Sequence, residues 1–389
     1  MDMFDFDKVV DRRGSSCFKY DARREVFGRE DILPMWVADM DFQSPPCVID
    51  AARRLCDLGV FGYTYRSRES KELFIQWVLE RYGWKIGIEQ LSSSPGIVAA
   101  LPVAIIAFTS VGDKILIQTP VYPPFHAIVK ENGRELVCSP LKIQEDGYVI
   151  DWENFESKLA GGVKMFIMSN SHNPIGKVWS YDELKKMGEL CCKYGVLIFS
   201  DDIHADLALY GNRHTIMAAI SHEIAMNTIT AMAPSKTFNI AGMLNSVIIA
   251  ENDEILKRFD KELNKLHLGL GNIFGHITME AAYRDGGPWL EELLRYLERN
   301  IDFAYDFIKA EVPGVTFFKP QSSFLLWLDF RGTGLPHKEV ANRLLNDAKL
   351  GLNDGLTFGP DGEGFFRMNI GTPLSVVQDG MERLRKILL

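Results

Sequence analysis

The 389-residue sequence predicts an α/β protein: a doubly wound, mostly parallel sheet accompanied by a smaller α+β domain. Short apolar runs rich in Val, Ile and Phe alternate with helical patterns through the middle of the chain. These runs lack strict polar–apolar alternation, which is typical of parallel strands covered on both faces. After Pro288 the pattern changes to a long amphipathic helix followed by two isolated strand-like segments, which indicates a second domain.

The expected elements follow this pattern along the chain. We expect helices and strands in the first domain at 97–109 (helix), 114–120 (strand), 123–132 (helix), 164–170 (strand), 181–193 (helix), 196–202, 228–235 and 246–250 (strands) and 253–267 (helix). The second domain should contain the long helix ending at Pro313-Gly314, strands at 322–330 and 364–372, and helices around 337–348 and 374–388. We therefore divide the chain into an N-terminal arm that contributes to the small domain (1–47), a large domain (48–287) and a small C-terminal domain (288–389).

The composition excludes several classes of protein. With 47% hydrophobic and 24% charged residues the chain is an ordinary globular one, and its formal charge of −9 argues against nucleic acid or an anionic membrane as main partner. The adjacent-arginine pairs that include Arg12, Arg23 and Arg53 are expected on solvated faces. The longest uncharged stretch, 91–112, has an apolar centre of only 13 residues, so it predicts a buried helix and no membrane span.

The six cysteines favour a cytoplasmic protein. They form no CxxC motif and no disulfide-type spacing, so we expect reduced thiols. The acidic start, MDMFDFDKVVDRR, has no apolar segment of the kind found in secretory signals.

Lys236 is a candidate for covalent chemistry. It lies in APSKTFNIAGM at the end of an expected strand, with no second charged residue from Pro234 to Asn245. A lysine is ordinarily a solvated surface group. In a partly apolar pocket, burial would lower the pKa of its amine and allow it to attack a carbonyl group.

Asp201 and His204 are three residues apart in SDDIHADL, where an expected strand opens into a loop. Ligands of α/β proteins bind at this carboxyl edge of the sheet. Asp201 and Asp202 could instead cap a following helix. A metal site of Asp201, His204 and Asp206 is a third interpretation, which the lack of a nearby second histidine and of any HExxH-like spacing disfavours.

Three further segments carry groups suited to ligand binding. Asn173 of SNSHNPIG begins a turn, and its amide can also donate a hydrogen bond to a ring oxygen or a carboxylate. Gly96 leads into a helix whose free N-terminal amides form a phosphate cradle, although Ser92–Ser94 could simply be a cap. Tyr122 in TPVYPPF follows a strand, where its ring could stack on a ligand.

Arg367 lies between two apolar residues in GFFRMNIG. Its charge needs a carboxylate or water, and either a substrate carboxylate or an internal Asp would serve. The sequence has no GxSxG elbow, P-loop or GxGxxG; Gly269, Gly271 and Gly275 come near the last, but one residue too far apart. Hydrolase, kinase and nicotinamide-dependent functions are therefore disfavoured.

In chain order these motifs resemble the aminotransferase fold of pyridoxal-phosphate enzymes, fold type I. SKTFNIAG is similar to the motif of the cofactor lysine, HNPIG to HNPxG, SDDIH to the motif of the aspartate on the pyridine nitrogen, and RMNIG to the motif of the carboxylate-binding arginine. WVADMDF, FGYTY and the histidine three residues after the aspartate are similar to the MalY/PatB subfamily, carbon–sulfur β-lyases of the cystathionine β-lyase type. The resemblance runs from residue 36 to residue 371.

The resemblance implies a role for each matching residue. Lys236 would bind the cofactor aldehyde and move the Cα proton, Asp201 would pair with the pyridine nitrogen, and Asn173 with the ring oxygen. The other cofactor contacts would be the phosphate ligands Gly96, Ile97, Val98 and Ser235, the stacking ring of Tyr122, His204 in place of the tyrosine of many aminotransferases, and Tyr63 from the partner subunit of a homodimer. The substrate would contact Arg367, Asn173, Val37 and Ala38, and no metal is implied. Leu244 stands where many aminotransferases carry a phosphate-binding arginine.

By resemblance, then, the chain is expected to be a lyase dependent on pyridoxal 5'-phosphate that cleaves L-cystathionine or related cysteine S-conjugates to thiol, pyruvate and ammonia. An aminotransferase of the same fold is the alternative, because the same residues serve both outcomes. A second role in contacting a transcription regulator is also open, since some subfamily members have one. The motifs do not identify the physiological substrate.

Overall fold

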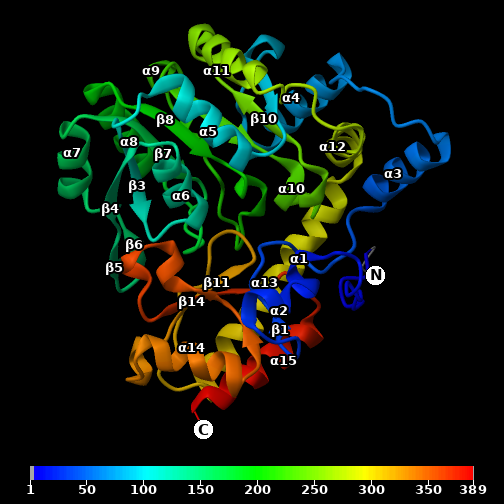
Figure 1. Ribbon diagram of the computed structural model, residues 1–389, viewed down its shortest axis with the longest axis vertical. Coiled ribbons are helices and arrows are strands. Elements are labelled where there is room, and N and C mark those ends of the chain that lie inside the picture. Colours follow the sequence, from blue (N-terminus) through cyan, green and yellow to red (C-terminus); the bar gives the residue numbers. More distant parts are fainter. Residues whose placement is uncertain (1–3, 389) are drawn as a thin grey trace.

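The computed structural model describes residues 4–388 and is built around a seven-stranded sheet of order β2-β10-β9-β8-β7-β3-β4 (Figure 1). The strands are Leu91–Ser94 (β2), Lys114–Thr119 (β3), Glu135–Pro140 (β4), Val163–Ser169 (β7), Leu197–Asp201 (β8), Thr228–Met232 (β9) and Ser246–Ile249 (β10). Strands β4, β3, β7, β8 and β9 are parallel neighbours, which confirms the predicted class. The strand expected at 246–250 runs antiparallel to both of its neighbours. Its connection from β9 holds only the four-residue helix α10 (Pro234–Thr237) and a 3-10 turn, which do not form a crossover over the sheet.

Helices cover both faces of this sheet. Side chains that alternate along each strand point to opposite faces, so Ile115 and Ile117 of β3 belong to one apolar cluster and Leu116 belongs to another. The first cluster includes α5 (Ile97–Phe108), α6 (Pro123–Glu131) and α11 (Asp253–Lys265); the second includes α7 (Trp152–Ala160) and α8 (Tyr181–Tyr194). The four helices expected from the sequence in this region are confirmed, and α7 is an addition.

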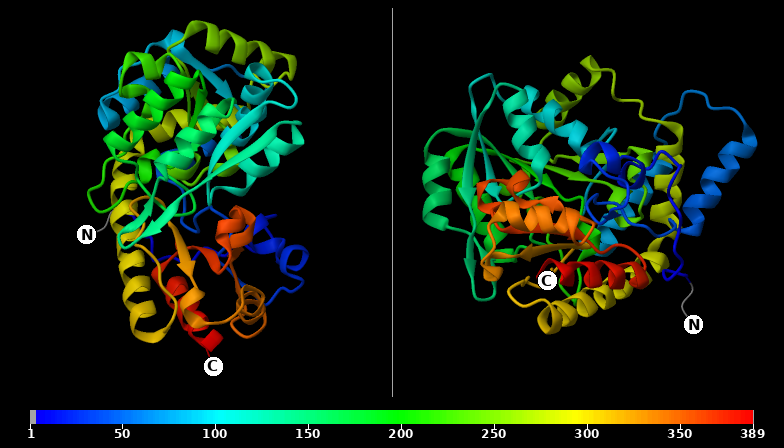
Figure 2. Two further views of the ribbon diagram at one scale, coloured as in Figure 1. Left: turned by 90° about the vertical axis from the view of Figure 1, so that its left-hand side faces the viewer. Right: turned by 60° about the horizontal axis from the view of Figure 1, so that its bottom comes forward.

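A smaller lobe lies at the other end of the molecule (Figure 1). Its antiparallel sheet has the order β11-β14-β13, with β11 at Leu325–Asp329, β14 at Phe365–Asn369 and β13 at Asn353–Asp354. Helices α14 (His337–Asn346) and α15 (Leu374–Arg385) pack with it. The long helix α13 (Gly287–Glu311) extends from the large lobe along the side of the small lobe, as the left view of Figure 2 shows. The domain boundaries at 47/48 and 287/288 stay a prediction.

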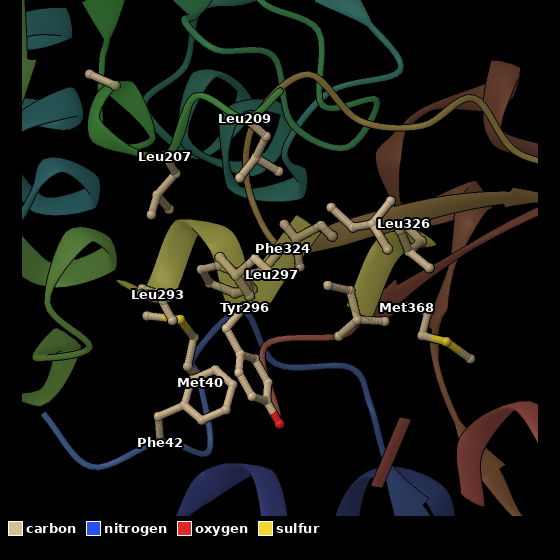
Figure 3. Packing of buried hydrophobic residues seen from close by; sticks show 14 of the residues in the cluster. Met40, Phe42, Leu207, Leu209, Leu293, Tyr296, Leu297, Phe324, Leu326 and Met368 are labelled. Atoms are coloured by element: carbon tan, nitrogen blue, oxygen red, sulfur yellow. The ribbon is translucent and has the colours of Figure 1, made fainter. Parts of the chain in front are cut away.

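One apolar cluster joins the lobes through α13. Leu293 and Leu297 of this helix belong to the same cluster as Leu207 from the large lobe and Phe324 and Met368 from the small lobe (Figure 3). The edge of the large sheet is thereby held against the small lobe.

The N-terminal arm packs on the small lobe. Strand β1 (Leu33–Pro34), after the short helices α1 (Phe18–Asp21) and α2 (Arg23–Phe27), pairs in parallel with β12 (Leu350–Gly351). The prediction of solvated faces holds for the exposed Arg53 but is wrong for the other two arginines: Arg12 forms ion pairs with Asp39 and Asp41, and Arg23 donates to the main-chain oxygens of Tyr20 and Ile32.

The remaining elements complete the structure. They are α3 (Pro46–Leu58), α4 (Arg68–Tyr82), α9 (His222–Ala225), α12 (Ile273–Asp285), β5 (Lys142–Gln144) and β6 (Gly147–Val149). Within residues 4–388, no helix combines the length and the apolar composition needed to cross a bilayer.

Candidate active site

A cavity of about 190 Å³ lies at the carboxyl edge of the large sheet. Here β7, β8 and β9 end side by side, since Ser169 is paired with Asp201, and Asp201 with Ala231. Ten of the residues selected from the sequence line the cavity: Ala38, Gly96, Ile97, Val98, Tyr122, Asn173, Asp201, His204, Ser235 and Lys236. The fold therefore gathers these residues from six separate stretches of the chain.

Lys236 lies on the short helix α10, directly after β9, and points into this cavity. Its Nζ donates a hydrogen bond of 2.5 Å to the main-chain oxygen of Ala38. Burial lowers the pKa of Lys236 to about 8; the charge of Arg367 acts in the same direction, and the carboxylates of Asp39 and Asp201 oppose it. At pH 7 about a tenth of an amine with such a pKa is unprotonated, far more than of an ordinary lysine, and the unprotonated form is the nucleophile.

Asp201 ends β8 and is buried beside the cavity. Its Oδ1 accepts a hydrogen bond of 3.1 Å from the amide of Ile203, and none of the ion pairs among residues 4–388 includes it. Burial raises the pKa of Asp201 to about 7, and the neighbouring Asp202 adds to the effect. A carboxylate in this position favours a cation beside it, such as a protonated ring nitrogen.

The two other acidic residues of SDDIHADL belong to different networks. Asp202 accepts hydrogen bonds from Ser200 and Asn170 and contacts His214 Nε2 at 2.7 Å. The 3-10 turn that follows, Ala205–Leu207, has no side-chain cap, so the interpretation of Asp201 and Asp202 as helix caps is wrong. Asp206 accepts from Trp77, Tyr82 and Thr237 and forms an ion pair with Arg81. Because its carboxylate is engaged in these contacts, the sequence-based metal trio of Asp201, His204 and Asp206 is not assembled.

His204 and Tyr122 also face the cavity. Burial lowers the pKa of His204 to about 3, and the charges of Lys236 and Arg367 add to this, so the imidazole is neutral. Its Nδ1 is buried and has no hydrogen-bond partner among the described residues. Tyr122 precedes α6, with its ring edge-on to that of Phe125 at 5.9 Å. Both rings are thus available to a ligand.

Asn173 follows β7 in a turn that requires a glycine. At Gly176 φ is +65°, and a Cβ atom there would lie 2.4 Å from Pro320 Cβ. The turn is closed by a hydrogen bond of 2.8 Å from the amide of Gly176 to the main-chain oxygen of His172. It brings Asn173 to the cavity, where its Oδ1 accepts from Arg367.

Arg367 is buried on β14 of the small lobe and approaches the cavity through Asn173. Its Nη1 donates to Asn173 Oδ1 at 3.1 Å, and its Nη2 donates to the main-chain oxygen of Trp36 at 3.1 Å and to Asn353 Oδ1 at 2.7 Å. Among residues 4–388 no carboxylate pairs with it, and its Nε has no partner, so the internal aspartate considered from the sequence is excluded there. Burial lowers the pKa of Arg367 to about 10. The guanidinium is suited to bind a carboxylate supplied by a ligand.

The helix α5 begins at the cavity. The amides of Ile97 and Val98 have no acceptor within the helix, because they belong to its first turn. Ser94 is not a cap, as one alternative had it, but ends β2 and donates to the main-chain oxygen of Gly96. A helix start with free amides can hold a phosphate. Ser235 lines the same cavity, and so does Leu244.

Three of the expected site residues do not line this cavity in the single chain: Val37, Tyr63 and Arg367, which meets it only through Asn173. Val37 contacts Asn369 through its main-chain oxygen. The side chain of Tyr63 is 100% exposed. Six other lining residues were not selected from the sequence, namely Pro95, Ser169, Ile203, Ala233, Ala241 and Asn245, and Leu244 was noted there only for lacking the arginine's charge. Most of them have no reactive or charged side chain that would distinguish them in the sequence. Leu244 and Asn245, eight and nine residues after Lys236, carry no charge that would indicate a phosphate site.

The whole chain is similar to known proteins. Residues 30–384 match the family model described as aminotransferase class I and II. The chain is 44% identical to the cystathionine beta-lyase PatB of Bacillus subtilis, with 98% of this chain and 99% of that protein covered. A PLP-bound putative aminotransferase from Clostridium difficile superimposes with a TM-score of 0.97 at 41% identity, covering 99% of this chain and 100% of that one. Cystalysin from Treponema denticola, whose crystal structure contains pyridoxal 5'-phosphate, gives a TM-score of 0.95 at 33% identity, with 99% of both chains covered.

Proposed function

Since the chain belongs to the aminotransferase class I and II family, and since the Lys236 amine faces one cavity with a buried carboxylate that forms no ion pair within residues 4–388, we propose that it is a carbon–sulfur β-lyase dependent on pyridoxal 5'-phosphate. Its relatives include a cystathionine beta-lyase and a cystalysin with the bound cofactor. The substrate is an amino acid with sulfur on Cβ, such as L-cystathionine or another cysteine S-conjugate, and the products are a thiol, pyruvate and ammonia.

The residues of the cavity fit this cofactor. The first amides of α5 and Ser235 suit its phosphate, Asp201 suits its ring nitrogen, Asn173 its ring oxygen, and Tyr122 and His204 its flat ring. With Leu244 in place of an arginine, the phosphate charge is balanced mainly by the dipole of α5 and by hydroxyl groups. When bound, the cofactor supplies an aldehyde for the lysine and a ring that withdraws electrons from the substrate Cα.

The chain's own residues then perform the reaction. Arg367 binds the substrate carboxylate and, through Asn173, holds it at the cavity. Lys236 Nζ takes the proton from Cα as general base. Asp201 keeps the ring nitrogen protonated, because a buried anion favours the cationic form of its neighbour. Once Cα has lost its proton, the bond between Cβ and sulfur breaks, and the sulfur leaves as a thiolate that takes up a proton. Water then hydrolyses the remaining three-carbon fragment to pyruvate and ammonia.

The test is a steady-state assay with L-cystathionine. A β-lyase releases pyruvate and a free thiol without any added keto acid. Turnover that strictly requires an added 2-oxo acid would establish an aminotransferase and contradict the proposal.

The exposed segment between α3 and α4 supports a homodimer with shared active sites. Tyr63 projects into solvent together with the exposed apolar side chains of Leu58, Val60, Phe61 and Tyr65. Apolar groups gathered on one segment are typical of an interaction surface. We place Tyr63 in the partner subunit's cavity, as the resemblance implies. A regulator contact stays a prediction.

The state of the cysteines supports a reducing compartment. All six are free of disulfides, and Cys17 and Cys191 are buried. Proteins with only free thiols are typical of the cytoplasm, where we place this enzyme.

A further inference from the structure

A segment of the N-terminal arm, residues 36–41 (the strap), contacts side chains of both lobes through its backbone. The main-chain oxygens of five consecutive residues, 36 to 40, each accept a hydrogen bond from a side chain. The donors are Arg367 to Trp36, Asn369 to Val37, Lys236 to Ala38, Asn369 to Asp39, and Asn239 to Met40. Such consecutive use of main-chain acceptors fixes the backbone closely.

Two of these donors are the central cations of the candidate site. Lys236 comes from the large lobe and Arg367 from the small lobe, and they bind strap carbonyls two residues apart. The position of the strap therefore sets where each cation lies with respect to the other.

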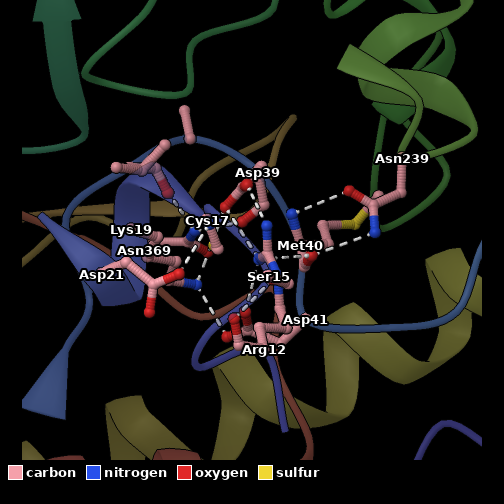
Figure 4. A network of polar contacts seen from close by, with 12 residues as sticks. Arg12, Ser15, Cys17, Lys19, Asp21, Asp39, Met40, Asp41, Asn239 and Asn369 are labelled. Atoms are coloured by element: carbon pink, nitrogen blue, oxygen red, sulfur yellow. Dashed lines mark hydrogen bonds and ion pairs between the residues drawn. The ribbon is translucent and has the colours of Figure 1, made fainter. Parts of the chain in front are cut away.

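Two acidic residues of the strap, Asp39 and Asp41, form ion pairs with Arg12 and Lys19, which precede the strap in the arm. We call these four residues the N-terminal cluster (Figure 4). Arg12 contacts Asp39 at 2.6 Å and Asp41 at 2.8 Å. Lys19 contacts Asp41 at 2.7 Å and Asp39 at 4.0 Å. The two cations balance the two anions.

This cluster is buried to an unusual degree. The side chains of Lys19 and Asp41 are 1% and 4% exposed, and those of Arg12 and Asp39 are 23% and 21% exposed. Removing one partner from such a group leaves a buried charge without compensation, so the geometry of the whole set is strongly enforced. Arg12 and Lys19 thereby tie the first part of the arm to Asp39 and Asp41, two of the six strap residues.

We propose that the N-terminal cluster is a positioning device for the reaction: Arg12 and Lys19, by holding Asp39 and Asp41, fix the Ala38 carbonyl against Lys236. This inference rests on the proposed lyase function and extends it to a region remote in sequence. None of the four acts as a catalytic residue, since they act through the strap.

The charges around Lys236 agree with this role. From the strap, Asp39 favours the charged form of the amine, and from β8, Asp201 does so more weakly. From β14, Arg367 disfavours it. The neutral imidazole of His204 also faces Lys236. Asp39 is the strongest of the favouring carboxylates, so changing its charge or its position should change the titration of the lysine nitrogen.

The test compares Arg12→Gln and Asp39→Asn in the holoenzyme, first by the pH titration of its visible absorbance. Asp39→Asn removes a negative charge that favours the protonated form of the Lys236 nitrogen. The midpoint of this titration should therefore fall by about 0.5–1 pH unit. Arg12→Gln leaves Asp39 without its counter-charge and should raise the midpoint. Shifts in the same direction, or none, would overturn the proposal, because a purely structural role predicts no opposite signs.

The second readout is turnover of L-cystathionine carrying deuterium on Cα. Misplacing a general base by a fraction of an ångström slows proton transfer, so both variants should lower kcat by about tenfold or more and raise the isotope effect on kcat. An unchanged kcat, or a lower kcat without a larger isotope effect, would count against the proposal. If Arg12→Gln does not fold, Arg12→Lys, which keeps the charge but not both contacts, should give an intermediate kcat; a wild-type kcat would overturn the idea.

The chain contains a matched control. Arg13 and Asp11 form an exposed ion pair of 2.7 Å in the same arm, with no contact to the strap. Arg13→Gln should leave the midpoint, kcat and isotope effect unchanged. The absorbance titration requires no substrate, so it judges the cluster even if L-cystathionine is not cleaved. A protein without any visible absorbance after incubation with the cofactor would instead refute the proposed function itself.

Discussion

Lys236 donates a hydrogen bond of 2.5 Å to the main-chain oxygen of Ala38, which precedes it by 198 residues. The acceptor belongs to the N-terminal arm and the donor to the short helix α10, directly after β9. The amine therefore already has a fixed partner on the side of the cavity that faces the small lobe. This contact ties the lysine of the candidate site to the backbone of the N-terminal arm.

Lys236→Ala should abolish turnover and the visible absorbance of the purified protein. The variant lacks both the amine that binds the cofactor aldehyde and the base for the Cα proton. Lys257→Ala, which changes an exposed lysine on α11, is the control and should behave as the wild type. Substantial activity or absorbance in Lys236→Ala would show that another residue binds the cofactor.

Arg367→Lys should weaken binding of amino-acid substrates, with KM rising by about tenfold or more. An ammonium group cannot reproduce the two parallel donors of a guanidinium, nor can it keep both contacts to Asn173 and Trp36. Steady-state kinetics with L-cystathionine would measure the effect, with Arg331→Lys as a control in an exposed ion pair. Unchanged KM and kcat would make Arg367 a structural residue.

The sequence predicted the strands and helices around the site well because buried parallel strands carry continuous apolar runs. Strands β3, β7, β8 and β9 all begin within one residue of their expected positions. Helix α12 was not predicted, since its buried residues, from Gly275 to Tyr283, surround the helix and leave no one-sided pattern.

The site itself was predictable as far as its residues follow strand ends. Asp201, Asn173 and Lys236 share that property, so local motifs were enough to bring them together. The role of Arg12 was not accessible, because its partners lie 27 and 29 residues away and are reached only after the arm folds on the small lobe. A pair of adjacent arginines carries no sign of such long-range contacts.

Asp201→Asn should stabilise the protein without cofactor increasingly as the pH rises. Burial raises the pKa of Asp201 to about 7 from an ordinary value of 3.8, so the protonated form favours folding. The free energy of unfolding is therefore highest, with respect to this group, below pH 4. It falls by at most about 4 kcal/mol as the pH rises toward 7. Urea unfolding at pH 5 and pH 8 would show the advantage of the variant growing with pH. A difference between the two proteins that does not depend on pH would contradict the assigned burial of the charge.

Thr237→Val should destabilise the turn that carries Lys236. Thr237 Oγ1 donates to Asp206 Oδ2 at 2.8 Å, and valine keeps the shape but not the donor. Loss of a hydrogen bond to a buried carboxylate costs about 1.5–3 kcal/mol. Urea unfolding would measure this, and Thr357→Val, at an exposed threonine bonded to a main-chain oxygen, should cost less. Equal losses in the two variants would show that Asp206 does not support the turn.

Mixing two inactive variants should restore activity if the proposed dimer shares its active sites. Tyr63→Ala removes a side chain that is fully exposed in the single chain, and Lys236→Ala removes the amine that faces the cavity. In a hybrid dimer one site would carry both defects and the other would carry neither, because each site takes Tyr63 from one subunit and Lys236 from the other.

Random exchange of equal amounts of the two variants should therefore recover about a quarter of the wild-type activity, since half of the dimers are hybrids with one intact site each. Each variant mixed with itself is the control and should stay inactive. Activity that remains absent after exchange, with hybrids verified by mass, would place Tyr63 outside the partner's site. High activity in Tyr63→Ala alone would show that the cavity functions without a tyrosine from the partner.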